Sequence, residues 1–234
     1  MNGVLRGNEN LIAAAHELKS PLVLVRQLAL MIQDGGLTNA EKQRLLEQIT
    51  LTSDRALRLT SDLTRSSRLN DTLFELEPIN PLSLCEDIVH ELSPLFKAHG
   101  RDIKLMPRKH RLLMIANRDL LRRIIVTFSD NALHYSDKDA PVELQINECD
   151  NGKTVRLGVR DYGPAVSTDV WKSLQHKLSR APQPLHARPQ SSGLGLYIAG
   201  QFADVMNGQI GVTRHSDGAT FYVDLQSSRQ LNLL

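Results

Sequence analysis

The chain has 234 residues with a formal net charge of +2, and 41% of its residues are hydrophobic, 23% charged and 4% aromatic. This length allows one large domain or two small ones, and the small net charge argues against a protein that binds nucleic acid. No apolar run approaches the roughly 20 residues that cross a bilayer, and no signal peptide opens the chain, so we predict no membrane segment and a cytoplasmic location. The same features fit the cytosolic part of a longer membrane-bound protein.

The first 70 or so residues carry the pattern of two helices joined by a short turn at Asp34-Gly35-Gly36. Apolar residues of the first helix recur at alternating spacings of four and three, which is typical of a packing seam: Leu11, Ala15, Leu18, Leu22, Val25, Ala29 and Ile32. Thr38 and Glu41 form a capping box for the second helix. Its seam has the same spacing: Leu45, Ile49, Thr52, Ala56, Leu59, Leu63 and Ser66. One hairpin leaves much apolar surface wet, so we predict a homodimer whose paired hairpins form a four-helix bundle.

A chemically loaded heptapeptide, His16-Glu17-Leu18-Lys19-Ser20-Pro21-Leu22, lies within the first helix. His16 and Ser20 are four residues apart and share a face, and Glu17 is the next residue round the helix. His16 directly follows the seam residue Ala15, so we expect it to be exposed at the edge of the apolar stripe, where it can meet other molecules. Taken alone, a histidine on a helix is usually only a solvated or core residue.

A change in composition near residue 70 predicts a helical domain over residues 1–72 and a second domain over residues 73–234. Strands are expected at about 74–79, 103–106, 112–115, 142–148, 154–160, 209–214 and 220–225. Helices are expected at about 82–98, from the cap Asn117 to 135, and at 193–206. The alternation predicts an α+β fold, in which helices cover one face of a mixed sheet. Residues 163–192 are proline-spotted and weakly patterned, as lids and binding loops often are.

Three groups in the second domain carry chemistry. Asp130-Asn131-Ala132-Leu133-His134-Tyr135 ends a predicted helix, where Asn131 offers an amide oxygen to a hard cation such as Mg²⁺. Asp161-Tyr162-Gly163 follows a strand, which places a carboxylate where it can accept from an exocyclic amine. Ser192-Gly193-Leu194-Gly195-Leu196 opens a helix, whose free backbone N–H groups favour phosphate. Each group is a weak signal alone, and their order and placement make them informative together.

With the histidine box, these groups make the sequence similar to the catalytic core of a sensor histidine kinase of two-component signalling. Residues 16–22 resemble the phospho-acceptor box of the dimerisation and histidine-phosphotransfer domain. The three later groups resemble the N, G1 and G2 boxes of the ATP-binding domain shared with the gyrase, Hsp90 and MutL ATPases, the GHKL or Bergerat type. The resemblance covers essentially the whole chain, and it implies a helical-hairpin dimerisation domain followed by a two-layer α/β sandwich.

The resemblance also implies roles for the acceptor box. His16 would attack the γ-phosphate of ATP and pass the phosphoryl group to an aspartate of a response regulator receiver domain. Glu17 would accept a hydrogen bond from the other ring nitrogen, which keeps the attacking nitrogen unprotonated. Ser20 would orient water for the reverse, phosphatase reaction.

The same resemblance assigns the ATP site. Asn131 would hold Mg²⁺ with Thr127 in its shell, His134 would lie near the phosphates, and Tyr135 would flank the nucleotide. The residues that would line the triphosphate open the last helix: Gly193, Leu194, Gly195 and Leu196.

The expected adenine contacts come from the G1 box, and the chain departs from the family around them. Asp161 would read the adenine amine, and Gly163 would let the base approach. Thr127 replaces the first asparagine of the N box, Ala165 replaces the second glycine of the G1 box, and no phenylalanine-rich F box is recognisable at residues 171–178. These departures favour an alternative, a dimeric signalling scaffold or phosphatase that binds nucleotide weakly.

A third reading, an ATPase of the gyrase or Hsp90 kind, would need no acceptor histidine. The context of His16, a histidine box on a predicted dimer helix, argues against it.

Overall fold

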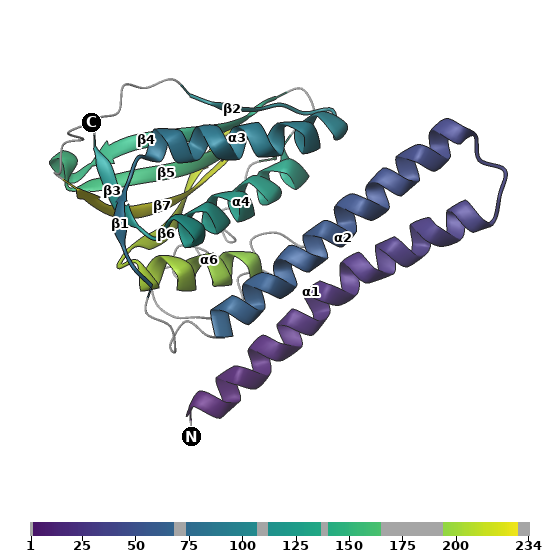
Figure 1. Cartoon of the computed structure of the whole chain (residues 1–234), viewed down its shortest axis with the longest axis horizontal. Coiled ribbons are helices and arrows are strands. Elements are labelled where there is room, and N and C mark those ends of the chain that lie inside the picture. Colours follow the sequence, from purple (N-terminus) through teal and green to yellow (C-terminus); the bar gives the residue numbers. More distant parts are fainter. Residues whose placement is uncertain (1, 68–73, 107–111, 137–139, 165–193, 229–234) are drawn as a thin grey trace.

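The structure is a computed structural model of the chain, and it describes residues 2–67, 74–106, 112–136, 140–164 and 194–228. Within these ranges, the side chains of residues 2–14, 16, 17, 55, 67, 134 and 135 are not described. Figure 1 shows a long helical hairpin beside a sheet that is covered by helices. The predicted boundary near residue 73 lies outside the described residues and stays a prediction. In the part of the chain described, no helix is long and apolar enough to cross a membrane.

The hairpin consists of α1 (Asn2–Gln33) and α2 (Asn39–Ser67), joined by a turn in which Gly35 and Gly36 have φ of +81° and +77°. Both glycines therefore occupy the left-handed region that side chains disfavour. The predicted capping box is confirmed, because the Thr38 amide donates to Glu41 Oε2 at 2.8 Å and the Glu41 amide donates to Thr38 Oγ1 at 3.3 Å. The Thr38 amide and the Thr38 hydroxyl both donate to the Glu41 carboxylate, and these two hydrogen bonds lower the pKa of Glu41, which keeps the carboxylate ionised.

The predicted seams are right for α2 and only partly right for α1. All seven seam residues of α2 are half-buried. Among the described side chains of α1, those that are buried or half-buried are Leu18, Pro21, Val25, Leu28 and Ile32. By contrast, Ala15 and Ala29 are exposed, and Leu22 is 61% exposed. A single partner helix covers only one flank of the apolar stripe, so the other flank of the α1 seam stays open.

The second unit is built on one mixed sheet. Its described strands are β1 (Glu77–Ile79), β2 (Ile103–Leu105), β3 (Leu113–Ala116), β4 (Val142–Cys149), β5 (Thr154–Asp161), β6 (Gln209–His215) and β7 (Gly218–Ser228). The strand order is β1-β3-β7-β5-β4-β2, and β6 also pairs with β7. The β2–β4 pair is parallel and the other described pairs are antiparallel. The predicted mixed sheet is therefore confirmed.

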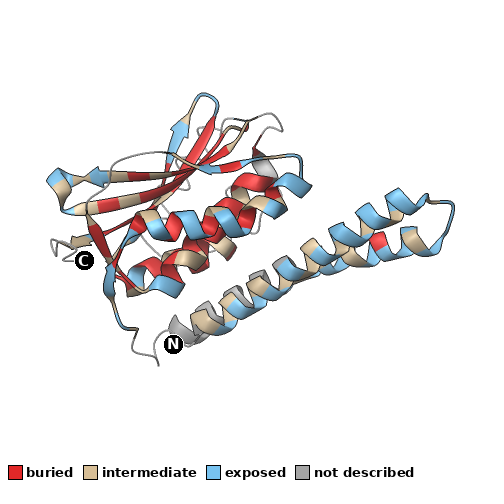
Figure 2. Cartoon of the chain, turned by 45° about the horizontal axis from the view of Figure 1, so that its top comes forward, coloured by how far each residue is buried: buried red, intermediate tan, exposed pale blue. Residues whose placement is uncertain are grey.

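Helices α3 (Pro81–Ala98), α4 (Arg118–Tyr135) and α6 (Leu194–Val205) cover one face of this sheet (Figure 1). The predicted cap of α4 is confirmed, because Asn117 Oδ1 accepts from the Leu120 amide at 3.2 Å. The core lies between these helices and the sheet, where Phe96, Phe128 and Phe202 are almost fully buried (Figure 2). This is the two-layer α/β sandwich that the pattern of elements predicted.

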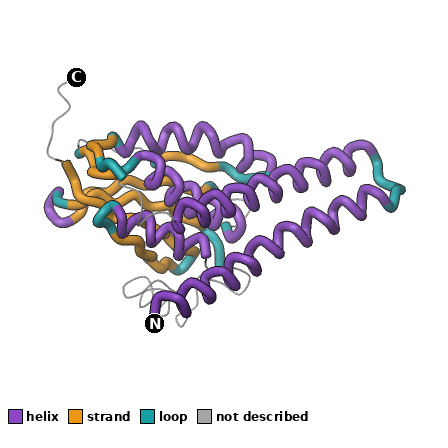
Figure 3. The backbone as a smooth tube through the Cα atoms, turned by 60° about the horizontal axis from the view of Figure 1, so that its bottom comes forward, coloured by secondary structure: helices purple, strands orange, loops and turns teal. Residues whose placement is uncertain are grey.

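The side chains of β5 alternate between the two faces of the sheet, and this alternation decides which face Asp161 lies on. Val155, Leu157 and Val159 point into the core beneath the helices. Because strand side chains alternate between faces, Asp161 shares the helix-covered face and Arg160 lies on the opposite face. Figures 1 and 3 both show the N-terminal part of α1 and the C-terminal part of α2 lying beside this unit, with the hairpin turn projecting away from it.

Candidate functional site

Helix α4 presents the two candidate magnesium ligands. Thr127 and Asn131 are both half-buried, and their spacing of four residues places them one above the other on one face of the helix. The Thr127 hydroxyl donates to the Arg123 carbonyl of its own helix at 2.8 Å, so its hydrogen is used and its lone pairs remain available. Thr127 therefore offers a hydroxyl oxygen and Asn131 an amide oxygen, and neither offers a carboxylate.

Helix α6 begins directly against α4. A Cβ atom at Gly195 would lie 3.1 Å from Thr127 Cγ2, so the glycine lets the two helices approach closely at the point where the N and G2 boxes meet. The side chains of Leu194 and Leu196 are 0% and 3% exposed and belong to the core. The two leucine side chains therefore pack into the core, and the backbone of this first turn is the part of the helix that we expect near a phosphate.

The end of β5 brings in the third predicted group. Asp161 is 2% exposed, and Gly163 just after the strand is buried. The Tyr162 amide donates to Ser136 Oγ at 3.3 Å, and Ser136 is the C-cap of α4. This hydrogen bond joins the residue after Asp161 to the helix that carries Asn131. The structure thus brings the N, G1 and G2 groups to neighbouring ends of α4, β5 and α6.

Several predicted site residues lie partly or wholly outside the described residues. Gly193, Ala165 and residues 171–178 are outside them. For His134 and Tyr135, only the backbone at the end of α4 is described.

The predicted phospho-acceptor box lies on α1. The backbone of His16 and Glu17 is helical, their side chains are outside the description, and the neighbouring Ala15 and Ser20 are exposed. Helix α1, which carries His16, contacts α6, the helix whose first turn contains Gly195.

The donors on α4 fit a metal ion that arrives with a nucleotide. Among the described residues, no three His, Cys, Asp or Glu side chains gather to hold a metal ion by themselves. Mg²⁺ prefers oxygen ligands and is commonly bound by one or two protein groups together with phosphates and water. The Asn131 amide and the Thr127 hydroxyl suit that arrangement.

Ion pairs that connect α2 to α4 were not predicted from the sequence. Arg123 Nη1 of α4 pairs with Asp62 Oδ1 of α2, and burial lowers the pKa of Arg123. Arg58 Nη2 lies 3.5 Å from Asp130 Oδ2, the residue before Asn131. The hairpin thus contacts the site helix beside the candidate metal ligands. No sequence signal identifies these partners, because they are about 60 residues or more apart along the chain.

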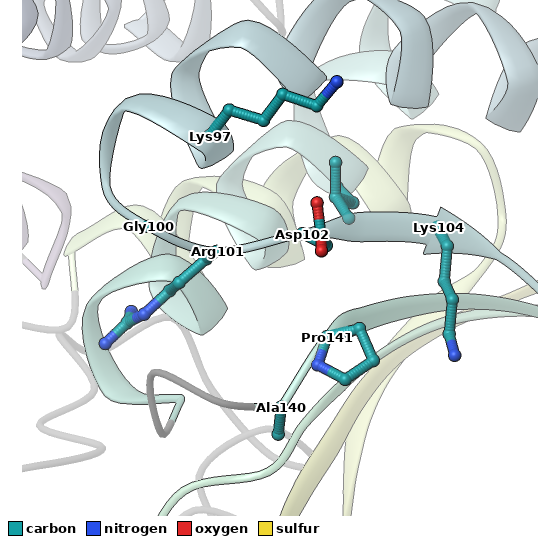
Figure 4. A pocket seen from close by; sticks show the side chains of 8 residues that line it. Lys97, Gly100, Arg101, Asp102, Lys104, Ala140 and Pro141 are labelled. Carbon is teal, nitrogen blue, oxygen red and sulfur yellow. The ribbon is translucent and has the colours of Figure 1, made fainter.

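A cavity of about 580 Å³ lies between the end of α3, strand β2 and the start of β4 (Figure 4). Its lining includes Lys97, Arg101 and Lys104, and none of its lining residues is a predicted site residue. The side chains of these three cations diverge in Figure 4. Lys104 Nζ also pairs with Glu143 Oε1 at 3.4 Å. We therefore place the candidate nucleotide site by the chemistry of α4, β5 and α6 and not by this hollow.

Comparison with protein families finds a match in the second unit. Residues 116–229 match the family described as histidine kinase-, DNA gyrase B-, and HSP90-like ATPase. The match contains the described parts of the N, G1 and G2 groups and leaves out the hairpin.

Relatives extend the similarity to the hairpin. Histidine protein kinase SaeS of Staphylococcus epidermidis is 24% identical over 215 residues, which cover 91% of this chain and 61% of that protein. Sensor histidine kinase YkoH of Bacillus subtilis is 27% identical over 219 residues, which cover 93% of this chain and 46% of that protein. The chain therefore spans less than two thirds of the length of these relatives.

Solved structures share the fold. Full-length ShkA in complex with AMPPNP aligns with a TM-score of 0.63 at 22% identity, over 97% of this chain and 47% of that chain. Histidine kinase ThkA in complex with the response regulator protein TrrA aligns with a TM-score of 0.62 at 16% identity, over 97% of this chain and 62% of that chain. At these identities, the alignments show only that the arrangement of helices and strands is shared.

Proposed function

Because the chain belongs to the sensor histidine kinases and carries an ATPase domain of the histidine kinase, DNA gyrase B and HSP90 type, we propose that it phosphorylates His16 from ATP and passes the phosphoryl group to a response regulator. The observation that carries the proposal is the meeting of α4, the end of β5 and the start of α6, with α1 packed beside α6. The complex of ThkA with TrrA supports a receiver domain as the partner.

In the proposed reaction, a ring nitrogen of His16 attacks the γ-phosphorus of ATP. An N–P bond forms, the bond to the bridging oxygen breaks, and ADP leaves with that electron pair. Glu17 accepts a hydrogen bond from the other ring nitrogen and keeps the attacking nitrogen unprotonated. A receiver aspartate carboxylate then takes the phosphoryl group, which regenerates His16. Ser20 orients the water of a phosphatase reaction.

The nucleotide is held mainly by position and charge, which is what phosphoryl transfer requires. Asp161 accepts from the adenine amine, and Gly163 lets the backbone approach the ring. Backbone N–H groups at the start of α6 face the triphosphate. Asn131, with Thr127 beside it, would hold Mg²⁺, which neutralises phosphate charge when bound. His134 and Tyr135 complete the site near the phosphates and the base.

The proposed active form is a homodimer through the hairpin. The open flank of α1 carries Ala15, Leu22 and Ala29, and Leu46 and Leu57 of α2 are 49% and 67% exposed. A second hairpin would cover this apolar surface and close a four-helix bundle.

A surface for the receiver domain is available on the same helix. Val23, Leu30 and Met31 of α1 are 54%, 42% and 46% exposed. Val23 and Leu30 follow His16 at spacings of seven and fourteen residues, which keeps them near its face of the helix. A receiver domain seated there would lie next to the phosphorylated histidine.

A second candidate function, a scaffold or phosphatase that uses ATP poorly, is favoured by one specific observation. The Thr127 hydroxyl donates to the Arg123 carbonyl and its methyl group faces Gly195, so the first N-box position offers no side-chain amide.

Incubation with Mg²⁺ and γ-labelled ATP separates the two functions. We expect acid-labile label on the wild type, label at background on His16→Ala, and unchanged label on His90→Ala, a control histidine that is exposed on α3. No label on the wild type at millimolar ATP would contradict the kinase and support the scaffold. Label that persists in His16→Ala would contradict the acceptor assignment.

A further inference from the structure

Arg160 is a buried cation on the face of the sheet opposite the helices. Its side chain is only 7% exposed, although it precedes the buried carboxylate of Asp161 by one residue. Nothing in the proposed phosphoryl transfer uses it. A guanidinium withdrawn this far from water is costly unless its donors are satisfied, so its partners indicate what it does.

Those partners all belong to the end of β5 or to the loop beside it. Arg160 Nη1 donates to the Asp161 carbonyl at 2.5 Å, and Arg160 Nη2 donates to Asp217 Oδ1 at 2.5 Å. Its Cζ atom lies 4.3 Å from the centre of the Tyr162 ring, which is within the range of a cation–π contact. One planar group therefore touches the two residues that follow it and ties them to the β6–β7 turn.

The β6–β7 turn is shaped to fit this arrangement. Gly218 has φ of +134°, and a Cβ atom there would lie 2.1 Å from the Asp161 carbonyl oxygen and 2.8 Å from Arg160 Nη1. Only glycine allows the turn to approach this closely. The backbone of Asp161 is thus enclosed between the guanidinium and the turn.

Tyr162 is anchored on its other side as well. Its hydroxyl donates to Glu143 Oε2 at 3.2 Å, and its amide donates to Ser136 Oγ at 3.3 Å. Burial and the Glu143 carboxylate raise the pKa of Tyr162, so the phenol stays protonated and keeps donating. The residue beneath the guanidinium is therefore connected to both β4 and the end of α4.

We infer that Arg160 is a positioning residue for base recognition: it fixes the end of β5 so that the Asp161 carboxylate on the opposite face keeps one orientation toward the exocyclic amine of an adenine nucleotide. The inference rests on the proposed function, because Asp161 reads adenine only if the site binds ATP. A hydrogen bond to a base edge depends on angle, so a loose strand end lowers discrimination between bases as well as affinity.

The same strand supplies a matched control. Arg156 also lies on the outer face, donates to both carboxylate oxygens of Asp224 at 2.7 Å, and stacks 3.5 Å from the centre of the Tyr222 ring. It has the chemistry of Arg160 without a contact to the end of the strand among its described partners. Loss of Arg156 should therefore cost stability and leave base recognition unchanged.

The test is calorimetric binding of ATP and of GTP to the wild type, Arg160→Met, Arg156→Met and Asp161→Asn. GTP carries a carbonyl where ATP carries the amine, so an oriented carboxylate favours ATP. We expect Arg160→Met and Asp161→Asn each to lower the ATP-over-GTP affinity ratio by roughly tenfold, the effect of one lost hydrogen bond to a charged group. Arg156→Met should leave the ratio at its wild-type value.

The ratio separates positioning from stability, because partial unfolding weakens both nucleotides equally. An unchanged ratio in Arg160→Met, with a lowered ratio in Asp161→Asn, would overturn the inference and leave the proposed function standing. A wild type that binds neither nucleotide, or an unchanged ratio in Asp161→Asn, would overturn the adenine assignment and this inference with it.

Two milder variants decide the matter if Arg160→Met fails to fold. Asp217 is 61% exposed, so Asp217→Asn removes one anchor of the guanidinium at a tolerant surface position. Arg160→Lys keeps the charge but cannot bridge Asp217, the Asp161 carbonyl and the Tyr162 ring. We expect a smaller drop of the same ratio in both variants, and an unchanged ratio in both would overturn the inference.

Discussion

Thr127 and Gly195 show how single residues set the distance between the helices of the candidate site. The Thr127 hydroxyl is held by the Arg123 carbonyl, so its methyl group cannot turn away from α6 without losing that hydrogen bond. A Cβ atom at Gly195 would meet this methyl carbon at 3.1 Å, which is tighter than an ordinary contact. Thr127, one of the departures from the family pattern, is therefore the residue that packs against the G2 glycine.

This contact predicts coupling between the two positions. Gly195→Ala should be more favourable by about 1 kcal/mol in a Thr127→Ser background than in the wild type, because serine removes the methyl carbon and keeps the hydroxyl. Thermal unfolding of the four proteins measures the coupling. Gly200→Ala on the same helix is the control, since its Cβ atom would lie at an ordinary 3.6 Å from Ile210 and should not couple to Thr127→Ser. Equal effects of Gly195→Ala in both backgrounds would contradict the packing described.

At the scale of elements, α2 has two roles. One side of it packs in the hairpin through its predicted seam. Helix α2 also holds α4, through the pairing of Arg123 with Asp62 and of Arg58 with Asp130. The seam residues Leu59 and Leu63, near the C-terminal end of α2, pack against the core of the second unit. The hairpin that carries His16 and the candidate nucleotide site are thereby connected through one helix.

The Arg123–Asp62 pair should contribute more to stability than an exposed pair of the same chemistry. Their side chains are 28% and 15% exposed, whereas those of the Arg118–Asp87 pair are 47% and 60% exposed. Double-mutant cycles with Arg→Gln and Asp→Asn changes should give a coupling of about 1 kcal/mol for the first pair and under about 0.5 kcal/mol for the second. Chemical unfolding provides the measurement, and high salt should reduce both values. Couplings of the reverse order would contradict a role for this contact in holding α4.

At the scale of the whole molecule, part of the apolar stripe of α1 stays exposed to solvent. The hairpin buries one flank of the apolar stripe, while Leu22 on the other flank is 61% exposed. Helix α1 packs against α2 and also contacts α6 of the second unit. A second hairpin is the partner that we propose for this flank.

Leu22→Glu should therefore convert the proposed dimer to a monomer. The glutamate would place a charge in the centre of the bundle, and burying it unpaired costs several kcal/mol. Light scattering after size-exclusion chromatography reports the mass. Gln27→Glu is the control, because Gln27 is exposed and lies about 140° round the helix from Leu22, so this variant should stay dimeric. A wild type that is monomeric at micromolar concentration would contradict the dimer.

The described helices and strands could be predicted closely from the sequence, because their signals are local. Asn117 caps α4, Thr38 and Glu41 cap α2, and the turn at residues 150–152 separates β4 from β5 as expected. The candidate site residues Asn131, Asp161 and Gly195 could be proposed for the same reason, since each lies at or near the recognisable end of a helix or strand.

Tertiary structure alone decided which surfaces of these elements meet. It showed that the α1 seam is half covered, that Thr127 touches Gly195, and that Arg123 pairs with a residue 61 positions away. It also showed that Arg160 lies behind Asp161 and is enclosed by a glycine of the β6–β7 turn. Periodicity reveals which face of an element is apolar or charged, but the partner of that face depends on distances between segments far apart in the chain, and only the folded chain sets those distances.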